Sequence, residues 1–125
     1  MLGNEISSNG IIDFKKSKII LSGLIDKYNL QLNPDVKISE LNISQQQKVE
    51  ILKMLYRDSE ILIFDEPTSV LSPVEIEEFF KIIAEFKKEG KTIIIITHKL
   101  KEVKVISDKV TVLSKGKVTF EGDNT

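Results

Sequence analysis

The sequence has no cysteine, no tryptophan and a single histidine. The absence of cysteine excludes disulfides and thiolate metal sites, and is typical of a reducing compartment. No apolar run reaches the roughly 20 residues of a transmembrane helix, and residues 1–5 lack the basic and apolar regions of a signal peptide. We therefore expect a cytoplasmic protein with no direct membrane insertion.

An excess of charge of either sign is also missing, since 18 basic and 19 acidic residues leave a net charge of -1. A chain this balanced has no basic footprint for nucleic acid or an anionic membrane, so we expect no nucleic-acid partner. The 125 residues have the length of one domain, and their 41% hydrophobic content excludes wholesale disorder.

The N-terminal part of the chain is predicted to be helical. Residues 1–14, rich in Gly, Ser and Asn, are expected to be irregular, and residues 29–41 to form a loop. Helices are expected over residues 15–28 and 45–57, with Ser44 as the cap of the second. Their apolar faces would hold Ile19, Ile20, Leu24 and Tyr28 in the first, and Val49, Leu52, Leu55 and Tyr56 in the second.

From residue 58 onward strands and helices alternate. Strands are predicted over residues 60–64, 92–97, 109–114 and 117–121, and helices over 73–89 and 101–106. Ser72-Pro73-Val74-Glu75 is a capping box with proline at the first helical position. The helix that it opens has a stripe expected to be buried, made of Ile76, Phe79, Phe80, Ile83 and Phe86. The nearly all-isoleucine strand 92–97 is expected to be buried on both faces.

This alternation predicts an α/β fold with a mostly parallel sheet, right-handed crossovers and flanking helices. A boundary is expected near residues 57–60. It divides the chain into a small helical part, 1–57, and a sheet-containing part, 58–125.

Two adjacent acids, Asp65 and Glu66, follow the apolar run Ile61-Leu62-Ile63-Phe64 and precede Pro67-Thr68-Ser69. An isolated acid pair at a strand end is more often a solvent-facing or capping feature. In this setting the pair lies where parallel α/β sheets bind ligands. We favour a catalytic function, with Asp65 on the side of a magnesium ion and Glu66 as a general base for water.

His98 directly follows the predicted isoleucine strand, so it too projects from a strand's carboxyl end. A lone histidine is more often structural than functional. Neighbouring strands that end in Asp65-Glu66 and in His98 would nevertheless converge on one site. There the imidazole could hydrogen-bond a terminal phosphate and the attacking water.

A second candidate site lies in residues 41–48, where Asn42, Ser44 and Gln45 lead into a helix. A helix N-terminus is a phosphate-binding feature, although an ordinary capped helix explains the same residues. Gly90-Lys91-Thr92 resembles the end of a phosphate loop. Position 85 is glutamate and a strand follows, so we read it as a helix stop.

Taken in order, these motifs resemble those of the ATP-binding cassette (ABC) ATPases over about residues 15–122. Residues 41–48 are similar to the signature motif, and 61–66 to Walker B with Glu66 at the catalytic glutamate. Residues 69–72 are similar to the D-loop, and Thr97-His98 to the switch histidine. The stretch 45–73 is similar to the first cassette of the tandem-cassette ATPases that energise sugar or nucleoside importers.

The resemblance implies a partial P-loop NTPase fold, with ATP and Mg²⁺ as ligands. It also implies a second ATPase cassette, which sandwiches the nucleotide head to tail, and membrane permease subunits. The expected location is then cytoplasmic and peripheral, at the inner face of the membrane through the permease. Asp65 would face the metal, Glu66 and His98 would be catalytic, and Asn42, Ser44 and Gln45 would contact nucleotide across the cassette interface.

The sequence also departs from the family pattern. It contains no Walker A loop and no recognisable Q-loop, and Asn42 and Ser44 stand where the signature motif usually has serine and glycine. The missing phosphate-loop strand would leave an open sheet edge beside the histidine strand. We therefore expect a carboxyl-terminal fragment of a cassette that is inactive alone.

Two other interpretations remain open at this point. One is a non-catalytic interaction or regulatory module that pairs with an intact cassette or a permease. The other is a soluble-type cassette ATPase of DNA repair or translation, against which the neutral charge and the Gln46–Ile51 stretch argue.

Overall fold

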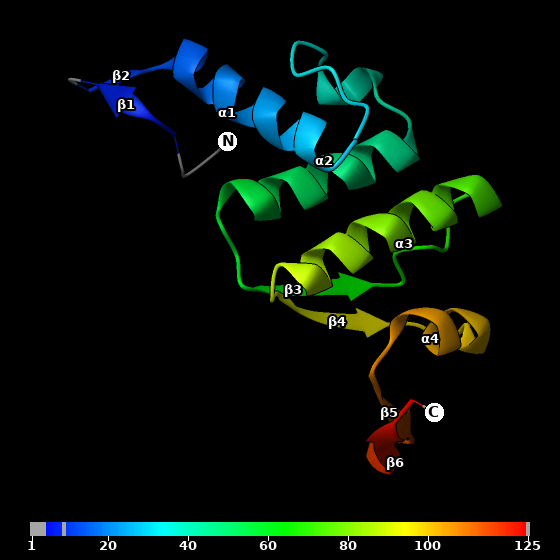
Figure 1. The fold of residues 1–125 in the computed structure, drawn as a ribbon. Helices are drawn as coiled ribbons and strands as arrows, with labels where there is room; N and C mark the ends of the chain where they lie inside the picture. Colours follow the sequence, from blue (N-terminus) through cyan, green and yellow to red (C-terminus); the bar gives the residue numbers. More distant parts are fainter. Residues whose placement is uncertain (1–4, 9, 125) are drawn as a thin grey trace.

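The computed structural model describes residues 5–8 and 10–124. Its helices are α1 (Phe14–Lys27), α2 (Ile43–Tyr56), α3 (Pro73–Lys88) and α4 (Leu100–Ile106), with a 3-10 turn η1 (Ile38–Glu40) before α2. Its strands are β1 (Ser7–Ser8), β2 (Ile11–Ile12), β3 (Ile61–Asp65), β4 (Thr92–Ile96), β5 (Lys109–Ser114) and β6 (Lys117–Asp123) (Figure 1). Within these ranges no helix is long and apolar enough to cross a membrane.

From residue 14 onward, the helices and strands agree with the predicted ones to within one or two residues at each end, and the 3-10 turn η1 lies in the segment expected to be a loop. The N-terminal segment differs more. We expected residues 1–14 to be irregular, but β1 and β2 pair as a short antiparallel hairpin. Gly10, at φ +79°, supplies the left-handed turn between them. Residues 1–4 and 9 of this prediction lie outside the described residues.

The parallel pair β3–β4 lies at the centre of the fold, and α3 is the crossover that joins its strands. The pairing runs in register from Ile61 opposite Thr92 to Asp65 opposite Ile96. Both strands therefore end at the same edge of the sheet, as the predicted α/β fold requires.

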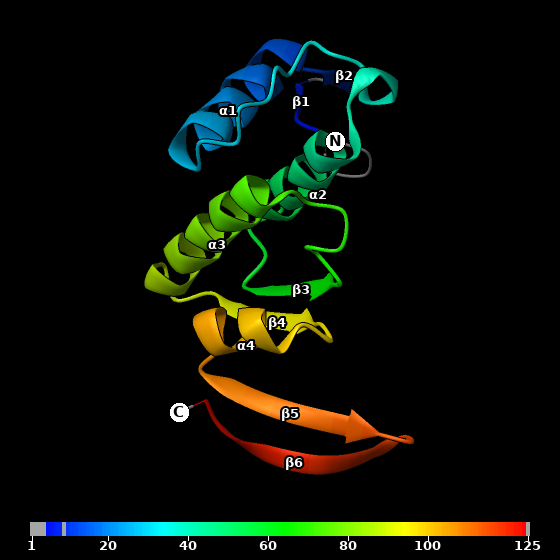
Figure 2. The ribbon, with the colours of Figure 1, turned by 90° about the vertical axis from the view of Figure 1, so that its right-hand side faces the viewer.

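One hydrophobic core lies between this sheet and the three long helices. Figure 2 shows α3 directly over β3, with α2 and α1 stacked beyond it. Leu62 and Phe64 point into the core, and the rings of Phe64 and Phe79 meet edge to face with centroids 5.4 Å apart. The predicted stripe of α3 is confirmed for Phe79, Ile83 and Phe86, whereas Ile76 and Phe80 are half-buried. Ile82 is buried in addition. The buried core consists of Ile25, Tyr28, Leu30, Ile51, Leu52, Leu55, Leu62, Phe64, Phe79, Ile82, Ile83 and Phe86.

The helical faces in the N-terminal part differ from those expected. In α1 the exposed side chains include Ile19 and Ile20, while Ile25 is buried instead. In α2 the buried set gains Ile51 beside Leu52 and Leu55. The sequence pattern predicted the two helices correctly. Which of their side chains face the core depends on where α1 and α2 pack against neighbouring elements.

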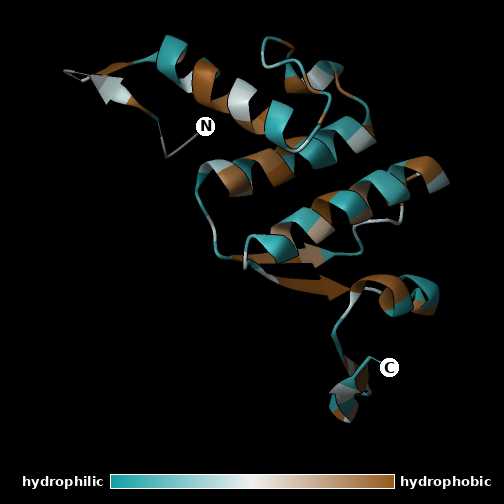
Figure 3. Cartoon of the chain, in the orientation of Figure 1, coloured by the Kyte–Doolittle hydropathy of each residue, from teal (hydrophilic) through white to brown (hydrophobic). Residues whose placement is uncertain are grey.

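The opposite face of the sheet is uncovered, so the prediction that strand 92–97 is buried on both faces was wrong. Ile94 and Ile96 on β4 are exposed, as are Ile61 and Ile63 on β3. The physical reason is that the helices of the described part pack on the other face only. Figure 3 shows the strongly hydrophobic β4 at this open side.

The last two strands form an antiparallel hairpin of their own. Among the described residues, β5 pairs only with β6, and β4 pairs only with β3. Figure 2 shows this hairpin standing apart from β4. The facing edges of β4 and β5 are therefore both unpaired here, which is the open edge that the sequence led us to expect.

Adjacent positions on β3 test which face of the sheet is covered. Leu62 is 0% exposed and Ile63 is 60% exposed. Leu62→Ala should lower the free energy of unfolding by about 2–5 kcal/mol, because it opens a cavity in the core. Ile63→Ala should change it by about 0.5 kcal/mol or less. Urea unfolding followed by circular dichroism measures both, and losses of equal size would mean that Ile63 is also covered.

Candidate catalytic edge of the sheet

The carboxyl ends of β3 and β4 carry the predicted catalytic residues into contact. Beyond the last strand pair, the backbone N–H of Glu66 donates to the carbonyl oxygen of Ile96 at 2.8 Å. This bond extends the ladder by one step and places Glu66 beside the loop that carries His98. The convergence follows from parallel pairing, because parallel strands present their carboxyl ends at one edge.

Glu66 and His98 form a direct hydrogen bond, with His98 Nδ1 2.8 Å from Glu66 Oε1. The side chain of His98 is 79% exposed and that of Glu66 is 35% exposed. Glu66 also has φ +47°, in the left-handed region that residues other than glycine seldom occupy. Such a backbone costs on the order of 1–3 kcal/mol and clusters at functional sites.

Two observations bear on whether this edge fits a magnesium ion. The exposed carboxylate of Asp65 makes no hydrogen bond or ion pair within the described part of the chain, and the buried Oε2 of Glu66 has no hydrogen-bond partner there. No group of three acidic, histidine or cysteine side chains gathers in that part. Mg²⁺ sites completed by water and phosphates use only one or two protein carboxylates, so Asp65 is a candidate ligand of such a site.

The N-terminus of α2 differs from the prediction in its capping residue. We expected Ser44 to cap the helix, but the cap is Asn42. Asn42 Oδ1 accepts from the N–H of Gln45 at 2.8 Å, and Gln45 Oε1 accepts from the N–H of Asn42 at 3.1 Å. This reciprocal capping box starts the helix at Ile43. Ser44 consequently lies inside the first turn.

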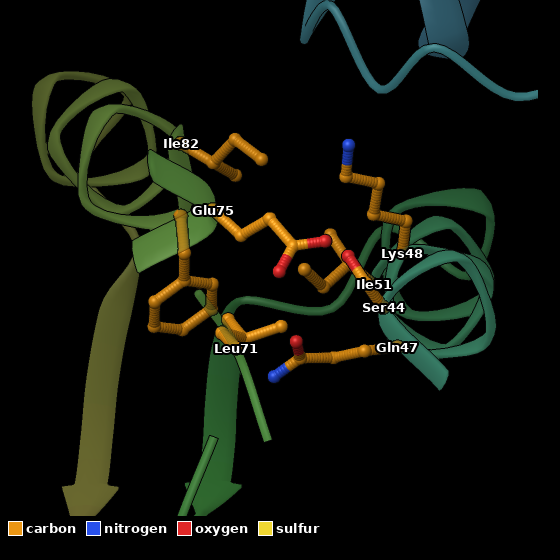
Figure 4. Close-up of a pocket in the computed structure, with 8 residues that line it drawn as sticks. Ser44, Gln47, Lys48, Ile51, Leu71, Glu75 and Ile82 are labelled. Atoms are coloured by element: carbon orange, nitrogen blue, oxygen red, sulfur yellow. The ribbon is translucent and has the colours of Figure 1, made fainter. Parts of the chain in front are cut away.

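The hydroxyl of Ser44 faces α3. Figure 4 shows Ser44 and Glu75 opposite each other across the small cleft between α2 and α3, which Gln47, Lys48 and Leu71 also line. Hydrogen bonds from the Ser72 backbone and the Ser44 hydroxyl hold the pKa of Glu75 below its ordinary value. The Ser44 hydroxyl thus lies opposite a carboxylate, so a phosphate bound there would meet the negative charge of Glu75.

The two predicted sites are separate in this structure. Among the described residues, no hydrogen bond or ion pair joins Asn42, Ser44 or Gln45 to Glu66 or His98. The link between them is indirect, through the side-chain amide of Gln47, which donates to the carbonyl oxygen of Pro67. Separation of this kind is what the family resemblance implies, since one cassette supplies the signature helix to the other.

Several polar residues next to the candidate catalytic edge were not predicted from the sequence. Thr68, Lys99 and Glu102 form a hydrogen-bonded cluster behind Glu66 and His98. Thr68 lies 34 positions from Glu102, so no local pattern signals their contact. The apolar run Ile61–Phe64 is a weak signal for the burial of Thr68, because it predicts a buried strand directly before the loop that holds this residue.

Capping at α2 gives a direct stability test. Asn42→Ala should destabilise the chain by about 1 kcal/mol, because it removes the acceptor for the Gln45 amide. Ser44→Ala should cost less, since alanine is the better helix former inside a first turn. Thermal and urea unfolding of the two variants measure the difference, and a larger loss for Ser44→Ala would reject Asn42 as the cap.

Known proteins similar to this chain are ATP-binding proteins of import systems. The chain is 48% identical over 117 residues to the nucleoside import ATP-binding protein NupA of Lactococcus lactis. It is 50% identical over 117 residues to the guanosine import ATP-binding protein NupO of Bacillus subtilis. Each match covers 94% of this chain and 23% of the relative. No protein-family model matches the chain.

The fold is that of solved ABC ATPase cassettes. The structure of cbiO1 from Clostridium perfringens, part of the ABC transporter complex cbiONQ, matches with a TM-score of 0.77 at 29% identity. This match covers 93% of the chain and 47% of cbiO1. The chain therefore belongs to the ABC ATPase family. Within that family, its relatives at about half identity are import ATP-binding proteins for nucleosides and sugars, and it spans under a quarter of the two named here.

Proposed function

We propose that the chain is part of the first ATP-binding cassette of an ABC importer for sugars or nucleosides, with Glu66 as the base that activates water. The observation that carries the proposal is the Glu66–His98 hydrogen bond at the carboxyl edge of β3 and β4, beside the unpaired carboxylate of Asp65. The names of the relatives, which import nucleosides, support the substrate class.

The different surroundings of the two carboxylate oxygens of Glu66 support this role. Oε1 is held by His98 Nδ1, whereas Oε2 is buried without a partner. An unsatisfied buried acceptor is costly, and a hydrogen bond or a proton from an attacking water would satisfy it. Glu66 is thereby oriented through one oxygen, while the other is left to take the proton.

His98 contributes through its second nitrogen. Because Nδ1 faces Glu66, the exposed ring presents Nε2 away from the carboxylate, toward solvent. A neutral imidazole accepts a hydrogen bond at Nε2, and a protonated one donates there, for example to a phosphate oxygen. Mg²⁺ held at Asp65 would supply charge neutralisation of the phosphates.

The remaining parts of the machinery lie outside this sequence, which has no Walker A loop. The proposal therefore includes the other portion of the same cassette, a second cassette, and permease subunits that hold the assembly at the inner face of the membrane. The open edges of β4 and β5 and the uncovered isoleucines of β3 and β4 agree with a missing portion of sheet and its covering layer.

The isolated chain should bind Mg-ATP weakly or not at all, because it lacks the backbone loop that cradles the phosphates. Isothermal titration calorimetry of the 125-residue chain measures this. We expect no saturation at millimolar nucleotide. A micromolar dissociation constant would show that the chain holds phosphates by another route and would sink this part of the proposal.

The role of Glu66 is tested in a complete import ATPase in which residues 15–122 replace the matching segment. Glu66→Gln keeps the shape of the side chain and removes the base, so kcat should fall by about 10² or more. The matched control is Glu60→Gln, at the exposed amino end of the same strand. An active chimera whose rate is unaffected by Glu66→Gln would reject Glu66 as the base.

A second candidate function is a non-catalytic module that pairs with an intact cassette or a permease. The unpaired edge of β4 and its exposed Ile94 and Ile96 favour it, since both features suit addition of another polypeptide. Co-purification of the native-length protein with such a partner, without ATPase activity in the complex, would favour this module over the hydrolase.

A further inference from the structure

A buried polar cluster lies directly behind the Glu66–His98 pair. Its centre is Thr68, which is 1% exposed and is the one buried polar or charged residue in the described part of the chain. The Thr68 hydroxyl lies 2.8 and 2.7 Å from the two carboxylate oxygens of Glu102, to which it donates. Lys99 Nζ donates to the same hydroxyl oxygen at 3.1 Å and to the Thr68 carbonyl oxygen at 3.0 Å.

The charges of this cluster balance. Lys99 Nζ lies 3.5 Å from Glu102 Oε1, and their side chains are 32% and 12% exposed. The hydroxyl of Thr68 therefore lies between an ammonium and a carboxylate: it accepts from Lys99 Nζ and donates to Glu102. A polar network that is satisfied in this way, and shielded from water, is stiff and specific in its geometry.

The cluster ties together the same two loops as the catalytic pair. Thr68 follows Glu66 by two residues, and Lys99 directly follows His98. In the outer link, between Glu66 and His98, the His98 side chain is 79% exposed, and a hydrogen bond or ion pair to so exposed a group contributes little. The inner link, between Thr68 and α4, is the shielded one. It is therefore the better placed of the two to fix the distance between the loops.

We infer that Thr68, Lys99 and Glu102 are positioning residues that hold Glu66 and His98 in register. They do not touch the reacting atoms, and their purpose in hydrolysis rests on the proposed function. The geometric part of the inference is independent of that function: without the cluster, His98 should lose its fixed hydrogen bond to Glu66.

Simple packing is the competing explanation for a buried threonine, and two substitutions separate it from positioning. Thr68→Val keeps the volume and removes the hydroxyl, whereas Thr68→Ser keeps the hydroxyl and removes a methyl group. If Thr68 only fills space, valine should be tolerated and serine should not. If the hydroxyl positions the loops, the order should be reversed.

Nitrogen NMR of the 125-residue chain measures the tautomer of the His98 ring without overlap, because His98 is the sole histidine. The nitrogen chemical shifts distinguish a ring that carries its proton on Nδ1 from one that carries it on Nε2. The Glu66 hydrogen bond should keep the proton on Nδ1 in the unmodified chain and in Thr68→Ser. Thr68→Val should lose this signature and give a mixture of tautomers, with helix content retained by circular dichroism.

A second pair of variants keeps the test decisive if Thr68→Val fails to fold. Lys99→Met removes the ammonium of the cluster, and Lys101→Met removes an exposed one two residues further on, in the first turn of α4. We expect loss of the Nδ1–H signature in Lys99→Met alone. The inference is overturned by a mixed tautomer in the unmodified chain, by an intact signature in both folded Thr68→Val and Lys99→Met, or by its loss in Thr68→Ser or Lys101→Met.

These measurements need no nucleotide, so they stand apart from the test of the proposed function. If Glu66→Gln leaves the chimera active while Thr68→Val loses the His98 signature, the positioning is real and the catalytic assignment fails. If Glu66→Gln abolishes turnover while the signature survives in Thr68→Val and Lys99→Met, the function stands and the positioning fails.

Discussion

Parallel pairing of β3 with β4 is the constraint on which the candidate site depends. The register brings Asp65 opposite Ile96, and the Glu66 amide continues the ladder to the Ile96 carbonyl oxygen. The hydrogen bond from the Glu66 amide to the Ile96 carbonyl oxygen thus marks the point at which the chain leaves each strand. The Glu66–His98 contact follows from the direction in which the chain leaves the two strands. The left-handed backbone of Glu66 lets its amide face β4 while the chain turns away from the sheet.

Much of this edge could be predicted from the sequence, because strand-end convergence is a property of topology. Local sequence patterns predicted the β3–α3–β4 order and the capping box at Ser72. Other features were not. Asn42 and Ser44 are both good capping residues, and the choice between them depends on the side chain of Gln45. The burial of Thr68 depends on residues more than 30 positions away, so no local period reveals it.

The exposed isoleucines show a different limit of sequence reasoning. An all-isoleucine strand indicates a preference for burial on both faces, but it does not say whether the covering layer belongs to the same stretch of chain. Here α3 covers one face, while Ile94 and Ile96 stay open on the other. The chain covers 47% of the cbiO1 chain that it matches.

Kinetic coupling between Glu66 and His98 in the complete chimeric ATPase is the measurement that bears most directly on the proposed site. The values needed are kcat for Glu66→Gln, for His98→Ala and for the double variant. Residues that act as one unit are strongly non-additive, so the double variant should be little slower than the slower single variant. If the two losses instead multiply, Glu66 and His98 act independently, and the hydrogen bond between them is not the basis of the site.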